Sequence, residues 1–319
     1  MWMARLAGPG VFGRERAAPP PRPEAGQAIV AVRYGGICGS DLPYFRYGGR
    51  QGAGTAPPGF PLHEIVGTVH DPGDTGLLPG STVVGWASRS DGLAELVATD
   101  VTGLATLPPG VNADETTVLA QPLACVRYAV DQLGPVRGRS AAVLGLGPIG
   151  LLFAWVLRER GASHVCGVDP VDRTRLATTF GLDDVVVSGS AAWAAGLGGH
   201  RPDVVIEAVG HQKQTLTDAI TAVADHGSVY CFGIPLTRPY PIDVTAVVRR
   251  NLRVLGGITH DRAYWLGRAL ADLTGNPALG RDLVTHVLPA ADPQRAFTTA
   301  RDPKPGQLKI VLDFAELPE

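Results

Sequence analysis

Three residues in the first quarter of the chain could together hold a metal ion. Cys38 lies in a polar, glycine-flanked turn, YGGICGSDLPYF, and His63 and Glu64 follow as an adjacent pair in FPLHEIVGTV. A thiolate, an imidazole and a carboxylate are suitable zinc ligands, and a catalytic zinc needs three protein ligands and one open position. The spacing alone is not diagnostic. Taken singly, Cys38 reads as a turn cysteine and His63 as a strand-end histidine bonded to backbone.

A second candidate site is the glycine-rich stretch VLGLGPIG. Gly145, Gly147 and Gly150 have GxGxxG spacing, with Pro148 and Ile149 inside it, after an apolar run and before a helical pattern. The first glycine permits a tight turn, the second lets the backbone approach a pyrophosphate, and the third allows close helix–strand packing. The helix N-terminus adds free N–H groups. Methyltransferases and ordinary glycine turns share this spacing, so the context decides.

The residues after the glycine motif supply that context. The next apolar run, HVCGVD, ends at Asp169, nineteen residues after Gly150, where a carboxylate can bind both ribose hydroxyls of a dinucleotide. An acid there repels a 2′-phosphate, so we expect NAD rather than NADP. Arg173 and Arg175 lie nearby; they either soften that preference or are solvated helix residues.

The pattern of predicted secondary structure around these residues changes near residue 125. The earlier part is rich in Gly and Pro, with short strand-like runs that predict an antiparallel β domain. Val-rich runs then alternate with helical stretches, which predicts a doubly wound parallel sheet. A final strand, QLKIVLDF, could return to the first domain. We therefore predict an α/β protein with a β-rich domain over residues 1–124, completed by 266–319, and a Rossmann domain over 125–265.

Composition limits the possible partners. The 319 residues are 45% hydrophobic and 18% charged, which suits two well-cored domains, and the formal net charge is -2. That charge offers no basic surface for nucleic acid or for a membrane. The first residues lack a signal-peptide pattern, and glycines and a proline interrupt the longest apolar run, at 141–157. We expect a soluble cytoplasmic protein without nucleic-acid or membrane partners.

The order of these motifs resembles the zinc-dependent medium-chain dehydrogenase/reductase family, over essentially the whole chain. GICGSDLPYF, HEIVGTV, AQPLACVRYAV and GLGPIGLL occur in the family's order, and the likeness is closest to polyol, sugar and threonine dehydrogenases. The resemblance implies a GroES-like catalytic domain, a Rossmann domain, NAD and a catalytic zinc held by Cys38, His63 and Glu64. The reaction implied is reversible oxidation of a small-molecule secondary alcohol to a ketone.

The resemblance also implies roles for the neighbours of Cys38. Ser40 matches the hydroxyl that bonds the substrate oxygen and relays its proton, and Asp41 matches the carboxylate that orients the zinc-binding histidine. Tyr44 matches an aromatic residue that lines the substrate pocket in the polyol group. A half-buried loop tyrosine is the alternative interpretation of Tyr44.

Three departures from the family pattern affect the metal chemistry. Leu62 replaces a glycine before the His–Glu pair, which alters the local turn. Gln121, in AQPLAC, replaces a glutamate; its amide oxygen can ligate zinc weakly or accept from a zinc-bound water, but it adds no negative charge. The four-cysteine lobe is missing, so we expect one catalytic zinc and no structural zinc.

The sequence also predicts an oligomer and is compatible with two alternative functions. A homodimer or homotetramer is expected, although the missing lobe often contributes to subunit contacts. One alternative function is a zinc-free medium-chain reductase that acts on an activated C=C bond. Another is a nucleotide-binding protein without turnover. Members of the first class generally lack the Cys and His ligands that this chain keeps.

Overall fold

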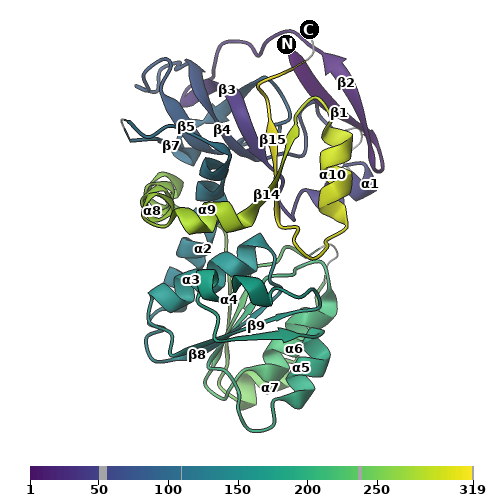
Figure 1. Cartoon of the computed structure of the whole chain (residues 1–319), viewed down its shortest axis with the longest axis vertical. Coiled ribbons are helices and arrows are strands. Elements are labelled where there is room, and N and C mark those ends of the chain that lie inside the picture. Colours follow the sequence, from purple (N-terminus) through teal and green to yellow (C-terminus); the bar gives the residue numbers. More distant parts are fainter. Residues whose placement is uncertain (50–55, 109, 236–238, 318–319) are drawn as a thin grey trace. The chain divides into compact units, whose positions relative to one another are not determined.

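The computed structural model describes residues 1–49, 56–108, 110–235 and 239–317. The chain divides into two compact units (Figure 1). Unit 1 consists of Met1–Ala124, Asp261–Pro303 and Gln307–Glu319, and unit 2 consists of Cys125–His260 and Lys304–Gly306.

Unit 1 is built around one sheet with the strand order β14-β15-β3-β4-β5-β7, and β6 also pairs with β3. Its strands are β3 (Gln27–Gly36), β4 (Glu64–Asp71), β5 (Thr82–Trp86), β6 (Leu96–Asp100), β7 (Leu104–Thr106), β14 (Val284–Pro289) and β15 (Lys309–Asp313). β14 and β15 run parallel, whereas the other pairs are antiparallel. The predicted return of QLKIVLDF to the first part of the chain is confirmed, because β15 pairs with β3.

Short helices and a hairpin complete unit 1. The hairpin consists of β1 (Trp2–Gly8) and β2 (Val11–Arg16), and the helical segments are α1 (Leu42–Tyr47), η1 (Val101–Gly103), η2 (Glu115–Leu119), α8 (Arg262–Gly275), α9 (Pro277–Leu283) and α10 (Pro293–Arg301). Helix α2 (Ala120–Leu133) begins in unit 1 and continues into unit 2. Neither the hairpin nor β14 was predicted from the sequence.

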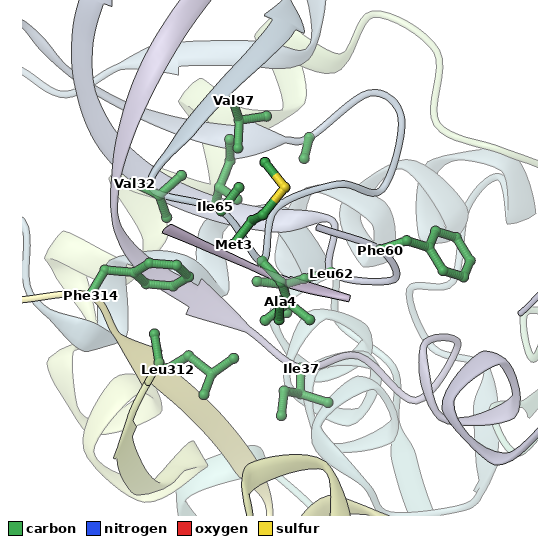
Figure 2. Close-up of a cluster of buried hydrophobic side chains, with 14 of the residues drawn as sticks. Met3, Ala4, Val32, Ile37, Phe60, Leu62, Ile65, Val97, Leu312 and Phe314 are labelled. Carbon is green, nitrogen blue, oxygen red and sulfur yellow. The ribbon is translucent and has the colours of Figure 1, made fainter. Parts of the chain in front are cut away.

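The core of unit 1 draws apolar side chains from strands that are distant in sequence. Figure 2 shows Met3 of β1, Val32 of β3, Ile65 of β4, Val97 of β6 and Leu312 of β15 converging on one buried cluster. Side chains alternate between the two faces of a strand, so β3 contributes Val30 and Val32, and β15 contributes Ile310 and Leu312. Burial of this kind is the main force that fixes strand register.

Unit 2 is a parallel sheet with helices on both faces (Figure 1). The strand order is β10-β9-β8-β11-β12-β13, with bounds β8 (Ser140–Leu144), β9 (His164–Asp169), β10 (Asp184–Val187), β11 (Val204–Glu207), β12 (Ser228–Cys231) and β13 (Arg253–Gly256). The helices are α3 (Pro148–Glu159), η3 (Thr174–Leu176), α4 (Ala177–Phe180), α5 (Ser190–Gly196), α6 (Lys213–Ala222) and α7 (Val244–Arg249). The predicted fold class, an antiparallel β-rich part with a doubly wound parallel sheet, is confirmed.

The apolar alternation of β8 explains why this sheet is covered on both faces. Ala142 and Leu144 pack in one cluster with Trp193 of α5 and Leu216 of α6. Val143, between them, faces α3 instead. Strands buried on both faces read as continuous apolar runs, as SAAVL does. Within the described residues, no helix is both long and apolar enough to cross a membrane.

Candidate active site

The structure brings the three predicted metal ligands together in unit 1. One ligand atom each from Cys38, His63 and Glu64 lies within 4.8 Å of the other two. Cys38 follows β3, while His63 directly precedes β4 and Glu64 begins it. The three candidate ligands therefore lie at the ends of two neighbouring strands of one sheet. These donor types match those of catalytic zinc sites.

Asp41 orients both strong ligands of this cluster. One of its carboxylate oxygens, Oδ1, lies 2.8 Å from His63 Nδ1, and the other accepts the Cys38 backbone N–H at 2.9 Å. A carboxylate only accepts, so Nδ1 carries the proton and Nε2 is left free to bind a metal. Holding the histidine in this tautomer raises its basicity as a ligand.

Burial and the same carboxylate act in opposite directions on the pKa of His63. Burial lowers the pKa of His63, but the neighbouring carboxylate of Asp41 and the thiol of Cys38 outweigh that effect and raise the pKa well above its usual value. Both groups favour a positive charge at the ring position. A divalent cation satisfies the same preference, and its binding releases the proton. The environment of His63 therefore suits a metal ion.

The turn after Cys38 is held in place by the helix that follows it. Asp41 occupies the N-cap position of α1 but does not cap that helix with its side chain, which points back to Cys38 and His63 instead. Phe45 anchors α1 in the core of unit 1, in stacked contact with Phe12 of β2. The unpredicted N-terminal hairpin thus supports the turn that carries Cys38.

Glu64 has a partner that sequence reasoning missed. The Glu64 side chain is 0% exposed, and its Oε2 lies 2.5 Å from Nζ of Lys309, which is 3% exposed. Lys309 begins β15, within the apolar run QLKIVLDF. The sequence contained one signal for this partner, which is the single lysine in an otherwise apolar strand. Lysines are almost never fully buried unless they are paired with an opposite charge.

The other predicted residues of unit 1 lie in the turn after Cys38, in α1 and in the first turn of α2. Gln121 is buried in the first turn of α2, and Ser40 is half-buried in the turn between Cys38 and Asp41. Tyr44 is half-buried as well, with its ring centroid 5.0 Å from that of Phe60. The structure leaves both interpretations of Tyr44 open, since a tyrosine packed on Phe60 could also line a pocket.

The glycine motif forms the strand–turn–helix that a dinucleotide site requires. β8 ends at Leu144, Gly145 turns with φ 89°, and Gly147 is the N-cap of α3, with Pro148 and Ile149 in its first turn. A Cβ atom on Gly147 would meet nothing within 4 Å, so the space before the helix is open. That open space at a helix N-terminus, lined by backbone N–H groups, suits a pyrophosphate.

Asp169 lies beside this turn, at the end of β9. Its Oδ2 accepts the Leu146 backbone N–H at 2.6 Å, and its Oδ1 accepts the Val171 N–H at 2.7 Å. The interpretation of Arg173 as a solvated helix residue is wrong: the residue is 4% exposed and donates to the Lys304 carbonyl oxygen. Burial lowers the pKa of Arg173, and the nearby Asp169 opposes that effect. Arg175 is exposed.

A buried carboxyl group near the metal ligands gives a prediction on stability. Asp91 belongs to the loop that contacts the segment before β4, where Gly92 donates to the Leu62 carbonyl oxygen and Ala87 donates to that of His63. Burial raises the pKa of Asp91 from 3.8 to about 6. The folded state therefore binds this proton more tightly than the unfolded state, and stability falls as the pH rises from about 4 to 6.

We expect Asp91→Asn to remove this penalty. The variant should gain about 2 kcal/mol in the free energy of unfolding at pH 8 and almost nothing at about pH 3, where the aspartate is largely protonated in both states. Urea unfolding at the two pH values measures the difference. An equal effect at both pH values would show that ionisation of Asp91 is not responsible.

Comparison with known proteins finds two family models that together cover most of the chain. Residues 24–126 match the family described as the alcohol dehydrogenase GroES-like domain, and residues 114–314 match the glucose dehydrogenase C-terminus. The D-altritol 5-dehydrogenase of Agrobacterium fabrum is 30% identical over 325 residues, covering 89% of this chain and 91% of that protein.

More distant relatives agree with these matches. A probable zinc-binding alcohol dehydrogenase of Mycobacterium tuberculosis is 26% identical over 330 residues, covering 92% of this chain and 83% of that protein. Among solved structures, the alcohol dehydrogenase TADH from Thermus sp. ATN1 superposes with a TM-score of 0.81 at 23% identity, covering 98% of this chain and 99% of that one. The last comparison supports the fold alone.

Proposed function

This chain belongs to the polyol branch of the zinc-dependent medium-chain dehydrogenase family, and on that premise we propose that it oxidises a polyol or sugar-like secondary alcohol to a ketone with NAD. Family membership makes it an oxidoreductase that acts on CH–OH groups. The observation that carries the proposal is the cluster of Cys38, His63 and Glu64, with His63 fixed by Asp41. The choice of a polyol rests on the D-altritol and sorbitol dehydrogenases among the relatives.

We assign the metal to Cys38, His63 and Glu64, with Gln121 as a neutral neighbour. When bound, zinc supplies Lewis acidity toward an alcohol oxygen, and the nicotinamide supplies the hydride acceptor. Cys38, His63 and Glu64 would hold the metal, and Asp41 keeps His63 Nδ1 protonated so that Nε2 can bind. The Ser40 hydroxyl accepts the alcohol proton and passes it toward solvent. Tyr44 borders the substrate.

The dinucleotide is proposed to bind at the β8–α3 turn of unit 2. Gly145, Gly147 and Gly150 shape the turn for the pyrophosphate, and Asp169 receives the ribose hydroxyls, which favours NAD over NADP. Arg173 lies buried beside Asp169, where its positive charge could reduce that preference. A single catalytic zinc without a structural one agrees with a chain whose other cysteines, Cys125, Cys166 and Cys231, lie in α2, β9 and β12.

The test is an NAD-reduction assay over sugars, polyols, cyclitols and simple secondary alcohols, before and after metal removal. We expect activity with at least one polyol, its loss in chelator, and its recovery on adding zinc. Chelator-insensitive reduction of a C=C bond would instead support the zinc-free reductase. Binding of NAD without any turnover would support a non-catalytic protein. The expected homodimer or homotetramer and the cytoplasmic location stay predictions.

Ser40→Ala examines the proton relay within this proposal. We expect kcat to fall by about 10²-fold while zinc content and NAD affinity stay unchanged, because only the acceptor of the alcohol proton is lost. Ser163→Ala, at an exposed position just before β9, is the matched control and should retain full activity. Activity within about threefold of wild type for Ser40→Ala would assign the relay to another group.

A further inference from the structure

Glu207, the last residue of β11, holds the turn that follows this strand. The residue is only 3% exposed, and its Oε1 accepts the backbone N–H groups of Val209 at 3.0 Å and of Gly210 at 2.9 Å. The Thr215 hydroxyl of α6 donates to the same oxygen at 2.9 Å. The Tyr240 hydroxyl donates to the Gly210 carbonyl oxygen at 2.7 Å. Both backbone polar groups of Gly210 therefore have fixed partners.

The same residue also fixes the neighbouring turn, after β12. The Glu207 carbonyl oxygen accepts the Gly233 N–H at 3.0 Å. A Cβ atom on Gly233 would lie 2.2 Å from Gly210 N, so the backbones of the two turns touch. A Cβ atom on Gly145 would lie 2.7 Å from Val209 Cγ2. Because β11 lies between β8 and β12, its turn is packed between the glycine-rich turn and the turn after β12.

The place of these turns in the sheet relates them to one half of a dinucleotide. Ligands of doubly wound sheets bind across the carboxyl ends of the strands, at the point where the strand order reverses. In unit 2 that point lies between β8 and β11, since β9 and β10 continue on one side and β12 on the other. Asp169, at the end of β9, is assigned to the adenosine ribose. The turns after β11 and β12 are thereby left for the nicotinamide half.

We propose that Glu207 is a positioning residue that fixes the backbone of these two turns, which contact the nicotinamide half of NAD. This inference rests on the dinucleotide site of the proposed function. At Gly210 and Gly233 no side chain can adjust the fit, so the backbone itself has to be held within about 0.5 Å of its place. A buried carboxylate supplies that rigidity, because hydrogen bonds to a charged acceptor are about twice as strong as neutral ones.

Glu207→Ala tests this inference through the two halves of the cofactor. We expect the Kd for NADH to rise at least about tenfold, because the two turns lose their common anchor. The Kd for ADP should stay within about threefold of wild type, since ADP has no nicotinamide riboside. Isothermal titration calorimetry measures both values. An unchanged Kd for NADH, or equal losses for NADH and ADP, would overturn the proposal.

Two further variants keep the test open if Glu207→Ala does not fold. Glu207→Gln retains an oxygen that can accept the same hydrogen bonds, and its Kd for NADH should stay within about threefold of wild type. Tyr240→Phe removes only the bond to the Gly210 carbonyl oxygen and keeps the ring in its apolar cluster. It should weaken NADH at least about threefold and leave ADP unchanged. Wild-type NADH binding by Tyr240→Phe would then count against the proposal.

Asp218→Asn is the matched control. Asp218 is another buried carboxylate of unit 2, but it accepts from Ser190 of α5 at 2.6 Å and from Gln214 of α6 at 2.7 Å. This variant should lower the melting temperature and leave the ratio of the two Kd values unchanged. A selective loss of NADH here as well would show a general effect of stability. Wild-type protein that binds neither NADH nor ADP would refute the proposed dinucleotide site itself, which distinguishes the two failures.

Discussion

Cys38→Ala should abolish stoichiometric zinc binding and lower kcat/KM at least about 10³-fold, because the variant loses the thiolate ligand and with it the Lewis acid. The remaining ligands, His63 and a Glu64 already engaged by Lys309, are too few for a catalytic site. Metal analysis of the purified variant and steady-state kinetics with the best alcohol of the substrate screen measure both effects. The fold should survive, since Cys38 is only half-buried.

Cys166→Ala is the matched control for this experiment. Cys166 lies in β9 of unit 2, where burial raises the pKa of its thiol to about 11 and keeps it neutral. A neutral thiol is a poor zinc ligand. This variant should keep its full zinc content and activity. Zinc retained at one ion per chain in Cys38→Ala would contradict the assignment of the metal site.

Gly150→Ala should disrupt the nucleotide-binding unit itself. A Cβ atom on Gly150 would lie 1.8 Å from the Gly145 carbonyl oxygen and 3.3 Å from Val143 Cγ1, so α3 cannot keep its place on β8. Overpacking of this severity costs about 3 kcal/mol or more. We expect insoluble protein, or a melting temperature lowered by about 6 °C or more, together with loss of NAD binding.

Gly147→Ala tests whether this turn binds NAD without disturbing the fold. A Cβ atom there would meet no protein atom within 4 Å, and the backbone has an ordinary φ of -70°. The melting temperature should therefore match that of wild type. NAD affinity should fall by about tenfold or more, because the new methyl group occupies the approach to the pyrophosphate. Unchanged NAD affinity, measured by calorimetric titration, would show that the dinucleotide binds elsewhere.

Local patterns were sufficient for the strands of unit 2 and for the nucleotide motif. The Val-rich runs of unit 2 and the strand, turn and helix around Gly145, Gly147 and Gly150 depend on residues close together in the chain. Turn formation and apolar periodicity are properties of such neighbours. The strands of the parallel sheet and helix α3 therefore lie at the positions that the sequence patterns predict.

The N-terminal hairpin and the burial of Arg173 could not be predicted in this way. The pattern of the first residues argued against a signal peptide but did not predict the hairpin, whose Phe12 stacks on Phe45 of α1. Arg173 is buried because the Lys304–Gly306 segment, from far along the chain, returns to unit 2. Both contacts depend on which distant segments pack together, and no short sequence window contains that information.

By itself, the sequence determined the types of candidate ligand, Cys38, His63 and Glu64, and the dinucleotide motif, because these follow from side-chain chemistry and from short spacings. The tertiary structure alone decided that Glu64 faces Lys309. That contact depends on the register of three strands and on the absence of a side chain at Gly36. Register is fixed by burial across the whole sheet, which is a collective property of the fold.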